Sequence, residues 1–199
     1  MKLKGLFLIL SSVILSSCTL FPSASTNQNI NLNTSPTSNM AQTTSSPNPT
    51  VNQVKDTITA ITTKNGQIVL KLYSDVTPHT VANFLKKVNS GFYDGLTFHR
   101  VIPDFMAQGG DPTGTGSGGG SQTSELNNLP FKRGSLGLAR TPASKEISND
   151  SQFFICFTTD GCQHLTGDYV NFGEVISGFD VLDKIVMGDK IIKITTTTK

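Results

Sequence analysis

The sequence has little net charge and few cysteines, and both shortages restrict its possible functions. Without Lys2 and Lys4, which lie in the N-terminal segment, 14 basic residues stand against 14 acidic ones. A nucleic-acid-binding protein usually carries a basic excess or a basic stripe, so we expect no nucleic-acid partner. The three cysteines are not accompanied by clustered histidines, so the sequence predicts no metal site, and nothing in it indicates a cofactor.

Charge is absent altogether from a long stretch near the N-terminus. Residues 19–54 contain no Asp, Glu, Lys or Arg, and Ser, Thr, Asn, Gln and Pro fill 27 of these 36 positions. So small a number of apolar groups does not offset the entropy that a chain loses on ordering. We therefore expect residues 18–54 to form a disordered polar tether.

The residues before this stretch combine a basic start with a short apolar run. Lys2 and Lys4 precede LFLILSSVIL at positions 6–15, and Cys18 follows two serines. This arrangement is typical of an export signal, and the run is too short to span a bilayer stably.

The end of this segment, Leu15-Ser16-Ser17-Cys18, resembles the lipobox of bacterial lipoproteins. In that motif the cysteine becomes the lipidated first residue after cleavage. The resemblance implies a signal peptide at residues 1–17 and an exported protein that lipidated Cys18 anchors to a bacterial membrane, on its periplasmic or extracellular face. Stable anchoring needs more than one acyl chain, and the motif implies two or three. The alternative is an ordinary secretory signal that ends in a cysteine by chance.

The rest of the chain, residues 55–199, has the pattern of one mainly β domain. Asn65-Gly66 between two β-prone runs predicts a hairpin of strands at 57–63 and 67–73. Thr77-Pro78 supplies a cap and a first-turn proline for a helix that Gly91 ends. Further strands are expected at 96–101, 105–108, 135–139, 152–157, 170–175 and 190–198, with a second short helix at 179–186. Many short strands with two helices indicate a closed barrel capped at its ends.

Glycines end the most distinctive stretch, FHRVIPDFMAQGGDPTGTGSGGG at positions 98–120. A phosphate-binding loop would open onto a helix, commonly with Gly-Lys-Ser or Gly-Lys-Thr, and neither feature follows Gly120. We therefore interpret residues 109–120 as a flexible surface loop. Asp104 and Asp111 flank loops and are interpreted as turn or solvated residues.

The residues before the glycines carry more information. FHRVIPDFMAQGGDP at positions 98–112 and SQFFICF at 151–157 closely resemble the signatures of cyclophilin-type peptidyl-prolyl isomerases. LGLAR at 136–140 and VNFGEV at 170–175 follow in the family's order, and the resemblance covers roughly residues 57–197. It implies an eight-stranded antiparallel barrel capped by two helices. It also implies an enzyme that accelerates rotation about Xaa–Pro bonds of exported proteins and so assists their folding.

The resemblance assigns roles to individual positions. Arg100 matches the family's catalytic arginine, and His99 beside it matches a residue with a structural role. The pocket that receives the proline ring would be formed by Phe105, Met106, Phe154 and Leu165. Positions that contact the peptide backbone or line the groove are matched by Gln108, Ala139 and Gln152. The partners implied are proline-containing polypeptides.

Two departures from the family pattern affect the groove. His164 stands where many eukaryotic members have tryptophan, and residues 145–150 replace the usual Asn-Thr-Asn-Gly stretch. Peptide affinity and binding of the family's cyclic-peptide inhibitor both depend on these positions. The alternative function is therefore a proline-peptide-binding chaperone or scaffold with little catalytic turnover.

Two cysteines lie inside the domain. A disulfide between Cys156 and Cys162 is permitted outside the cytoplasm. Cys156 lies within the apolar run SQFFICF, which is typical of a small unpaired core residue. We therefore favour two reduced cysteines, and a Cys156–Cys162 disulfide remains the alternative.

Overall fold

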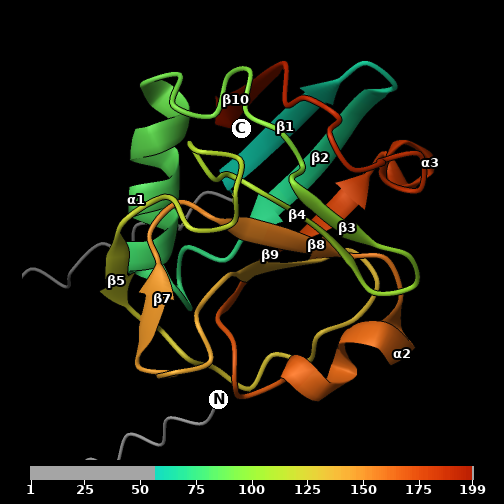
Figure 1. The fold of residues 1–199 in the computed structure, drawn as a ribbon. Helices are drawn as coiled ribbons and strands as arrows, with labels where there is room; N and C mark the ends of the chain where they lie inside the picture. The colour runs from blue at the N-terminus through green and yellow to red at the C-terminus, as the bar shows by residue number, and fades with distance from the viewer. Residues whose placement is uncertain (1–56, 199) are drawn as a thin grey trace, which may run out of the picture. The chain divides into compact units, whose positions relative to one another are not determined.

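The computed structural model describes residues 57–198, and Figure 1 shows their arrangement. Eight strands form one curled sheet in which every neighbouring pair is antiparallel. In spatial order they are β10 (Lys193–Thr198), β1 (Thr57–Thr63), β2 (Gly66–Leu72), β9 (Asn171–Ser177), β6 (Ser135–Leu138), β8 (Phe153–Cys156), β4 (Met106–Gly109) and β3 (Arg100–Ile102). The signal peptide, Cys18 and the tether expected at residues 1–54 lie outside the described residues.

The two edges of this half-barrel approach each other through the segments before β3 and β10. Thr97 and Lys190 form an isolated antiparallel bridge. The backbone N–H of Phe98 donates to the carbonyl of Asp189 at 2.8 Å, and that of Ile191 donates to Leu96 at 2.8 Å. The prediction of an eight-stranded antiparallel barrel is confirmed as a curled half-barrel.

The predicted hairpin at Asn65-Gly66 is present between β1 and β2, which pair along their whole length from Thr57–Leu72 to Thr63–Gly66. Gly66 has a φ of 128°, a backbone conformation that only glycine adopts readily. Ile61, Ile68 and Leu70 on these strands are fully buried and belong to the main core.

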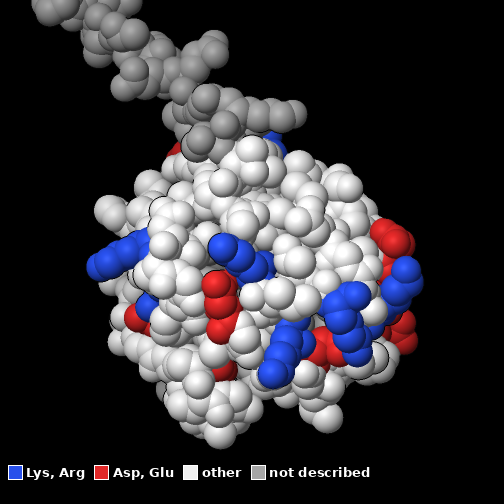
Figure 2. All heavy atoms as spheres, turned by 90° about the horizontal axis from the view of Figure 1, so that it is seen from above, with Lys and Arg blue, Asp and Glu red and all other residues white. Residues whose placement is uncertain are grey.

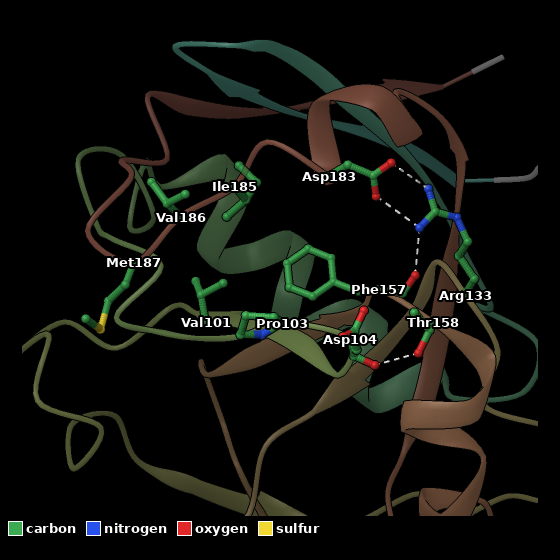
Figure 3. A pocket seen from close by; sticks show the side chains of 10 residues that line it. All are labelled: Val101, Pro103, Asp104, Arg133, Phe157, Thr158, Asp183, Ile185, Val186 and Met187. Carbon is green, nitrogen blue, oxygen red and sulfur yellow. Dashed lines mark hydrogen bonds and ion pairs between the residues drawn. The ribbon is translucent and has the colours of Figure 1, made fainter.

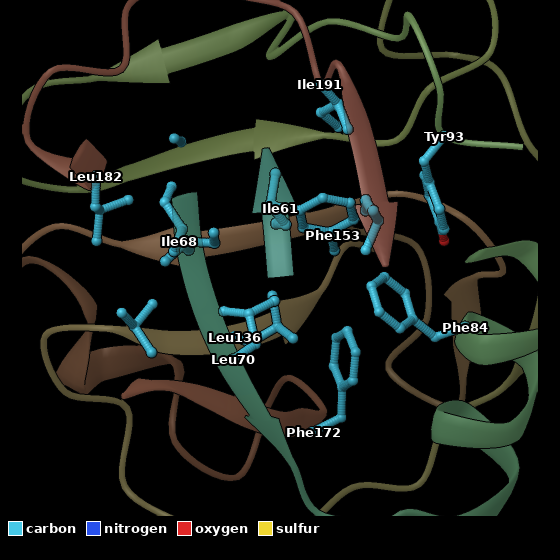
Figure 4. Close-up of a cluster of buried hydrophobic side chains, with 14 of the residues drawn as sticks. Ile61, Ile68, Leu70, Phe84, Tyr93, Leu136, Phe153, Phe172, Leu182 and Ile191 are labelled. Atoms are coloured by element: carbon cyan, nitrogen blue, oxygen red, sulfur yellow. The ribbon is translucent and has the colours of Figure 1, made fainter. Parts of the chain in front are cut away.

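Aromatic rings form the centre of that core (Figure 4). Phe84 of α1 (Pro78–Asn89) meets Phe153 of β8 and Phe172 of β9, with ring centroids 5.8 and 5.5 Å apart. Tyr93 lies 5.7 Å from Phe153. Full burial of each such side chain contributes ~1.5–3 kcal/mol, so this cluster is what fastens α1 to the sheet.

The start of α1 differs from the prediction. Pro78 is in the first turn as expected, but the Thr77 hydroxyl donates to the carbonyl of Tyr73. The first free N–H groups of the helix, those of His79 and Thr80, donate instead to the Glu125 carboxylate at 3.1 and 2.7 Å. The N-terminal cap is therefore supplied by a residue 45 positions away from Thr80.

The remaining elements are short. α2 (Thr159–Cys162) leads into a 3₁₀ turn, η1 (Gln163–Leu165), and the helix expected at 179–186 is only α3 (Phe179–Leu182). β5 (Ser121–Thr123) and β7 (Ile147–Asn149) form a separate two-stranded ladder that was not predicted. Within residues 57–198, no helix combines the length and apolar character needed to cross a membrane.

The Glu125 cap yields a stability prediction. Glu125→Ala leaves two N–H groups at the start of α1 without their carboxylate partner, and we expect it to lower the free energy of unfolding by ~1–2 kcal/mol. Urea unfolding would measure the loss. Glu146→Ala, the same change at an exposed carboxylate, is the control and should fall within ~0.5 kcal/mol of the parent. Equal effects of the two variants would contradict the capping role.

Candidate active site

A pocket of about 300 Å³ opens where β3, β4 and β8 lie side by side. Eight of the nine groove residues expected from the sequence line it, and Gln152 lines an adjoining hollow of about 150 Å³. Two residues that the sequence analysis missed, Arg140 and Tyr169, complete the wall. The full lining is Arg100, Phe105, Met106, Gln108, Ala139, Arg140, Phe154, His164, Leu165 and Tyr169.

Strand register places the central side chains together. Arg100 of β3 pairs with Gln108 of β4, and Gln108 pairs with Phe154 of β8. The Phe154 ring crosses over Gly137 of β6, where an added Cβ would lie 2.1 Å from the ring. The glycine in LGLAR is therefore needed to let the phenylalanine ring form the pocket floor.

Apolar contacts complete the floor. Met106, Phe154 and Leu165 belong to a second buried cluster, separate from the main core. Phe131 stacks on Phe154 with ring centroids 5.6 Å apart. The pocket thus has a water-excluding base of the kind that an apolar ring would enter.

A chain of polar side chains runs from the pocket to the glycine-rich segment. Arg100 Nη1 donates to Gln108 Oε1 at 3.3 Å, and Gln108 Nε2 donates to Gln152 Oε1 at 2.9 Å. Gln152 Nε2 then donates to the carbonyls of Gly116 and Gly118 at 3.1 and 2.8 Å. This chain orients the Gln108 and Gln152 amides and holds Arg100 at the rim, where it is exposed.

The glycine-rich segment is more fixed than the flexible surface loop we expected. Asp111 is 1% exposed, and its carboxylate accepts from the Thr113 N–H and hydroxyl at 2.8 and 2.9 Å and from the Gly116 N–H. Asn149 Nδ2 donates to the Gly118 carbonyl at 3.0 Å. Of the two interpretations of Asp111, turn residue or solvated residue, the structure supports the first, because its buried side chain forms the inner anchor of the turn.

His99 does not line the pocket. Its two ring nitrogens are buried and have no hydrogen-bond partner within residues 57–198. Burial is the main reason that the pKa of His99 lies below its ordinary value. A neutral ring packed beneath the glycine-rich segment, 4.0 Å from where a Gly116 Cβ would be, is compatible with the structural role implied for this residue.

The structure joins Cys156 to Cys162, so the expectation of two reduced cysteines is wrong. Cys156 ends β8, and α2 turns back so that Cys162 meets it within the pocket's apolar cluster. The bond holds the η1 turn against β8. That turn carries Leu165 on the pocket floor and the exposed His164, whose ring centroid lies 5.7 Å from that of Phe105.

A larger hollow of about 500 Å³, shown in Figure 3, contains no residue of the predicted site. It is lined by Val101, Pro103, Asp104, Arg133, Phe157, Thr158, Asp183, Ile185, Val186 and Met187. Its arginine is already occupied, because Arg133 binds both Asp183 carboxylate oxygens at 3.0 Å and the Phe157 carbonyl at 2.7 Å. The smaller pocket, with an arginine free of carboxylates, is the better candidate for catalysis.

Comparison with known proteins agrees with the pocket's composition. A family model described as "Cyclophilin type peptidyl-prolyl cis-trans isomerase/CLD" matches residues 58–198. The chain is 41% identical over 140 residues to a peptidyl-prolyl cis-trans isomerase of Synechococcus elongatus, covering 68% of this chain and 93% of the relative. It is 42% identical over 143 residues to a peptidyl-prolyl cis-trans isomerase of Helicobacter pylori, covering 69% and 85%.

Solved structures show the same likeness. A crystal structure of a cyclophilin type peptidyl-prolyl cis-trans isomerase from Cryptosporidium parvum matches with a TM-score of 0.66 and 32% identity, over 73% of this chain and 99% of that one. A second crystal structure of that protein, in the presence of the dipeptide Ala-Pro, matches with a TM-score of 0.65 and 31% identity, over 71% and 99%. The present chain is therefore an isomerase of peptide bonds that precede proline. It belongs to the cyclophilin-type family.

The Asp111 anchor predicts a pH dependence. Burial by itself would raise the pKa of Asp111, but hydrogen bonds from Thr113 and from the N–H groups of Gly118 and Gly116 lower it to about 2. A free aspartate titrates near ~3.9, so this stabilisation is present above that pH and is lost as the pH falls toward about 2.

We therefore expect Asp111→Asn to unfold at lower urea than the parent at pH 7. The difference in urea midpoint between the parent and the variant should narrow as the pH falls from ~4 toward ~2, because the parent then loses the same charge. Asp180→Asn, at an exposed carboxylate that within residues 57–198 pairs with Lys184 alone, is the control. A gap that stays constant with pH would show that the ionised carboxylate is not what stabilises the turn.

Proposed function

We propose that this isomerase acts on Xaa–Pro bonds of proteins outside the cytoplasm, assists their folding, and works from a membrane through lipidated Cys18. Arg100 is proposed as the catalytic residue. The observation that carries the proposal is the position of its guanidinium at the rim of a pocket lined by Phe105, Met106 and Phe154.

The proposed mechanism needs no nucleophile, because no covalent bond forms or breaks. Rotation must disrupt amide resonance, over a barrier of ~18–20 kcal/mol. As resonance is lost, the proline nitrogen gains a lone pair, and Arg100 can donate a hydrogen bond to it from a permanently charged group. The site then binds the twisted amide better than either planar form, which is the requirement for catalysis.

The lowering of the barrier that catalysis requires is larger than one hydrogen bond from Arg100 can supply. Acceleration from ~0.01 to ~100 turnovers per second needs ~5.4 kcal/mol. A hydrogen bond to a charged group contributes ~1.5–3 kcal/mol. The rest must come from the apolar base, which holds the proline ring and excludes water from an amide that becomes less polar as it twists.

Two features support export and anchoring. The sequence Leu15-Ser16-Ser17-Cys18 resembles a lipobox, and the uncharged residues after it suit a tether between membrane and enzyme. The Cys156–Cys162 bond adds an independent argument, because disulfides persist in oxidising compartments outside the cytoplasm.

The second candidate function, a chaperone or scaffold, is favoured by exposed His164 at the pocket rim. The same pocket would receive the family's cyclic-peptide inhibitor.

The catalytic role of Arg100 can be tested by exchange spectroscopy on an Ala-Pro peptide with catalytic amounts of the full chain. We expect Arg100→Ala to lower kcat/KM ~10- to 100-fold, since it removes a charged hydrogen-bond donor. Circular dichroism should show an unchanged fold, because Arg100 is exposed. Lys190→Ala, which removes a cation at another exposed position, is the matched control.

Near-normal turnover in Arg100→Ala would contradict the catalytic role assigned to Arg100. A parent that binds the peptide without accelerating its exchange would support the scaffold function instead.

Anchoring can be tested in a bacterial host. We expect the parent to sediment with membranes and to incorporate radiolabelled palmitate, and Cys18→Ala to do neither, because the variant has no thiol to acylate. Lys190→Ala should behave as the parent. Equal membrane association of the parent and Cys18→Ala would favour a different mode of attachment, and a parent that is soluble and unlabelled would favour the ordinary secretory signal.

A further inference from the structure

The groove of this enzyme is lined by basic and not by acidic side chains. The chain has three arginines, Arg100, Arg133 and Arg140. Arg133 forms a bidentate ion pair with Asp183. Within residues 57–198, neither of the other two has a carboxylate within ion-pair distance. Both of them line the proline pocket.

Arg140 is held in place without being neutralised. Its Nε donates to the Asp168 carbonyl at 2.9 Å, and its Nη1 donates to the Thr141 carbonyl at 3.0 Å. The guanidinium carbon lies 4.4 Å from the centre of the Tyr169 ring. Carbonyls and an aromatic face orient a cation but leave its net charge in place, so Arg140 is a fixed positive group.

Acidic side chains near the groove do not line it, and two of them are paired with lysines. The Asp168 carboxylate lies 3.3 Å from Lys145, and Asp150 pairs with Lys87 at 3.3 Å. Asp111 is buried in the glycine-rich turn. Among the described residues that line the pocket and its adjoining hollow, there is no Asp or Glu. On the face shown in Figure 2, basic and acidic side chains lie close to one another.

Arg140 also occupies the junction of the two hollows. Gln108, Ala139 and Arg140 line both the proline pocket and the adjoining hollow. An extended peptide advances ~3.3–3.6 Å per residue. A side chain one or two positions from a proline seated in the pocket therefore comes within reach of the Arg140 guanidinium.

We propose that Arg140 is a specificity-determining residue and that, with Arg100, it directs the enzyme to proline segments that carry Asp or Glu within two residues of the proline. Nε and Nη1 of Arg140 donate to backbone carbonyls of Asp168, Thr141 and Ser144, which fixes the guanidinium and leaves its Nη2 group to donate to a substrate carboxylate. This proposed preference depends on the isomerase function of the same site. It specifies which proline-containing substrates the site favours.

The test uses the full chain and four pairs of peptides, in which Glu or Gln stands two before, one before, one after or two after proline. Exchange spectroscopy gives kcat/KM, and line broadening gives the dissociation constant of each peptide, so slow turnover does not block the comparison. We expect Glu to be favoured over Gln about fivefold at one or more positions in low salt, as for a single partly exposed ion pair. The ratio should fall below about twofold in ~0.5 M NaCl because of screening.

Variants separate charge recognition from structural support. Arg140→Gln should reduce the Glu/Gln ratio toward that of the parent in high salt, with Arg100 accounting for what remains, and Arg140→Lys, which keeps the charge, should retain most of the preference. Lys190→Gln removes the same charge from an exposed position outside both hollows and should keep the parent ratio. A residue that only supports Tyr169 would affect both members of each peptide pair equally.

Three outcomes would overturn the proposal. They are a parent that treats Glu and Gln peptides alike at all four positions, a parent preference that salt does not weaken, and an Arg140→Gln variant that keeps the parent ratio. If Arg140→Gln fails to fold, as judged by circular dichroism, two other measurements still test the proposal. They are the salt dependence of the parent's Glu/Gln ratio and the Glu/Gln ratio of Arg140→Lys.

Discussion

Strand β8 is buried on both faces, and the rest of the structure depends on that constraint. Successive strand residues point to opposite sides. Phe153 therefore enters the main core against Phe84, and Phe154 enters the pocket cluster over Gly137. One strand thus links the packing that stabilises the domain to the surface that receives substrate. A one-residue slip in register would exchange the two faces and abolish both.

Next to this strand, polar side chains form a hydrogen-bonded chain that leads from the glycine-rich segment to the pocket rim. Gln152, directly before β8, connects the Gln108 amide to carbonyls of the glycine-rich segment, and Asp111 holds that segment from inside. Gln108 in turn contacts Arg100. The proposed catalytic group is therefore positioned by neutral amides, which orient the guanidinium and leave its charge available to substrate.

Sequence reasoning predicted the parts of the fold that depend on neighbours along the chain. The Asn65-Gly66 hairpin and the helix α1, with Pro78 in its first turn, follow from local turn and helix preferences. It failed where the partner is distant in sequence. Glu125 caps α1 from 45 positions beyond Thr80, β5 pairs with β7 although residues 124–146 lie between them, and Cys162 meets Cys156 only because α2 folds back. No local pattern reports such contacts.

The sequence by itself determined the family, the positions of most strands along the chain and most of the pocket residues, because motifs such as FHRVIPDFMAQGG and SQFFICF occupy fixed places on the sheet. Only the tertiary structure decided which charges remain unpaired. In the chain, Arg133 and Arg140 are similar residues in neighbouring segments. In the fold, Asp183 neutralises Arg133, whereas Arg140 rests on Tyr169 and keeps its charge in the groove. Ion pairing depends on distance in space, and that distance exists only once the chain has folded.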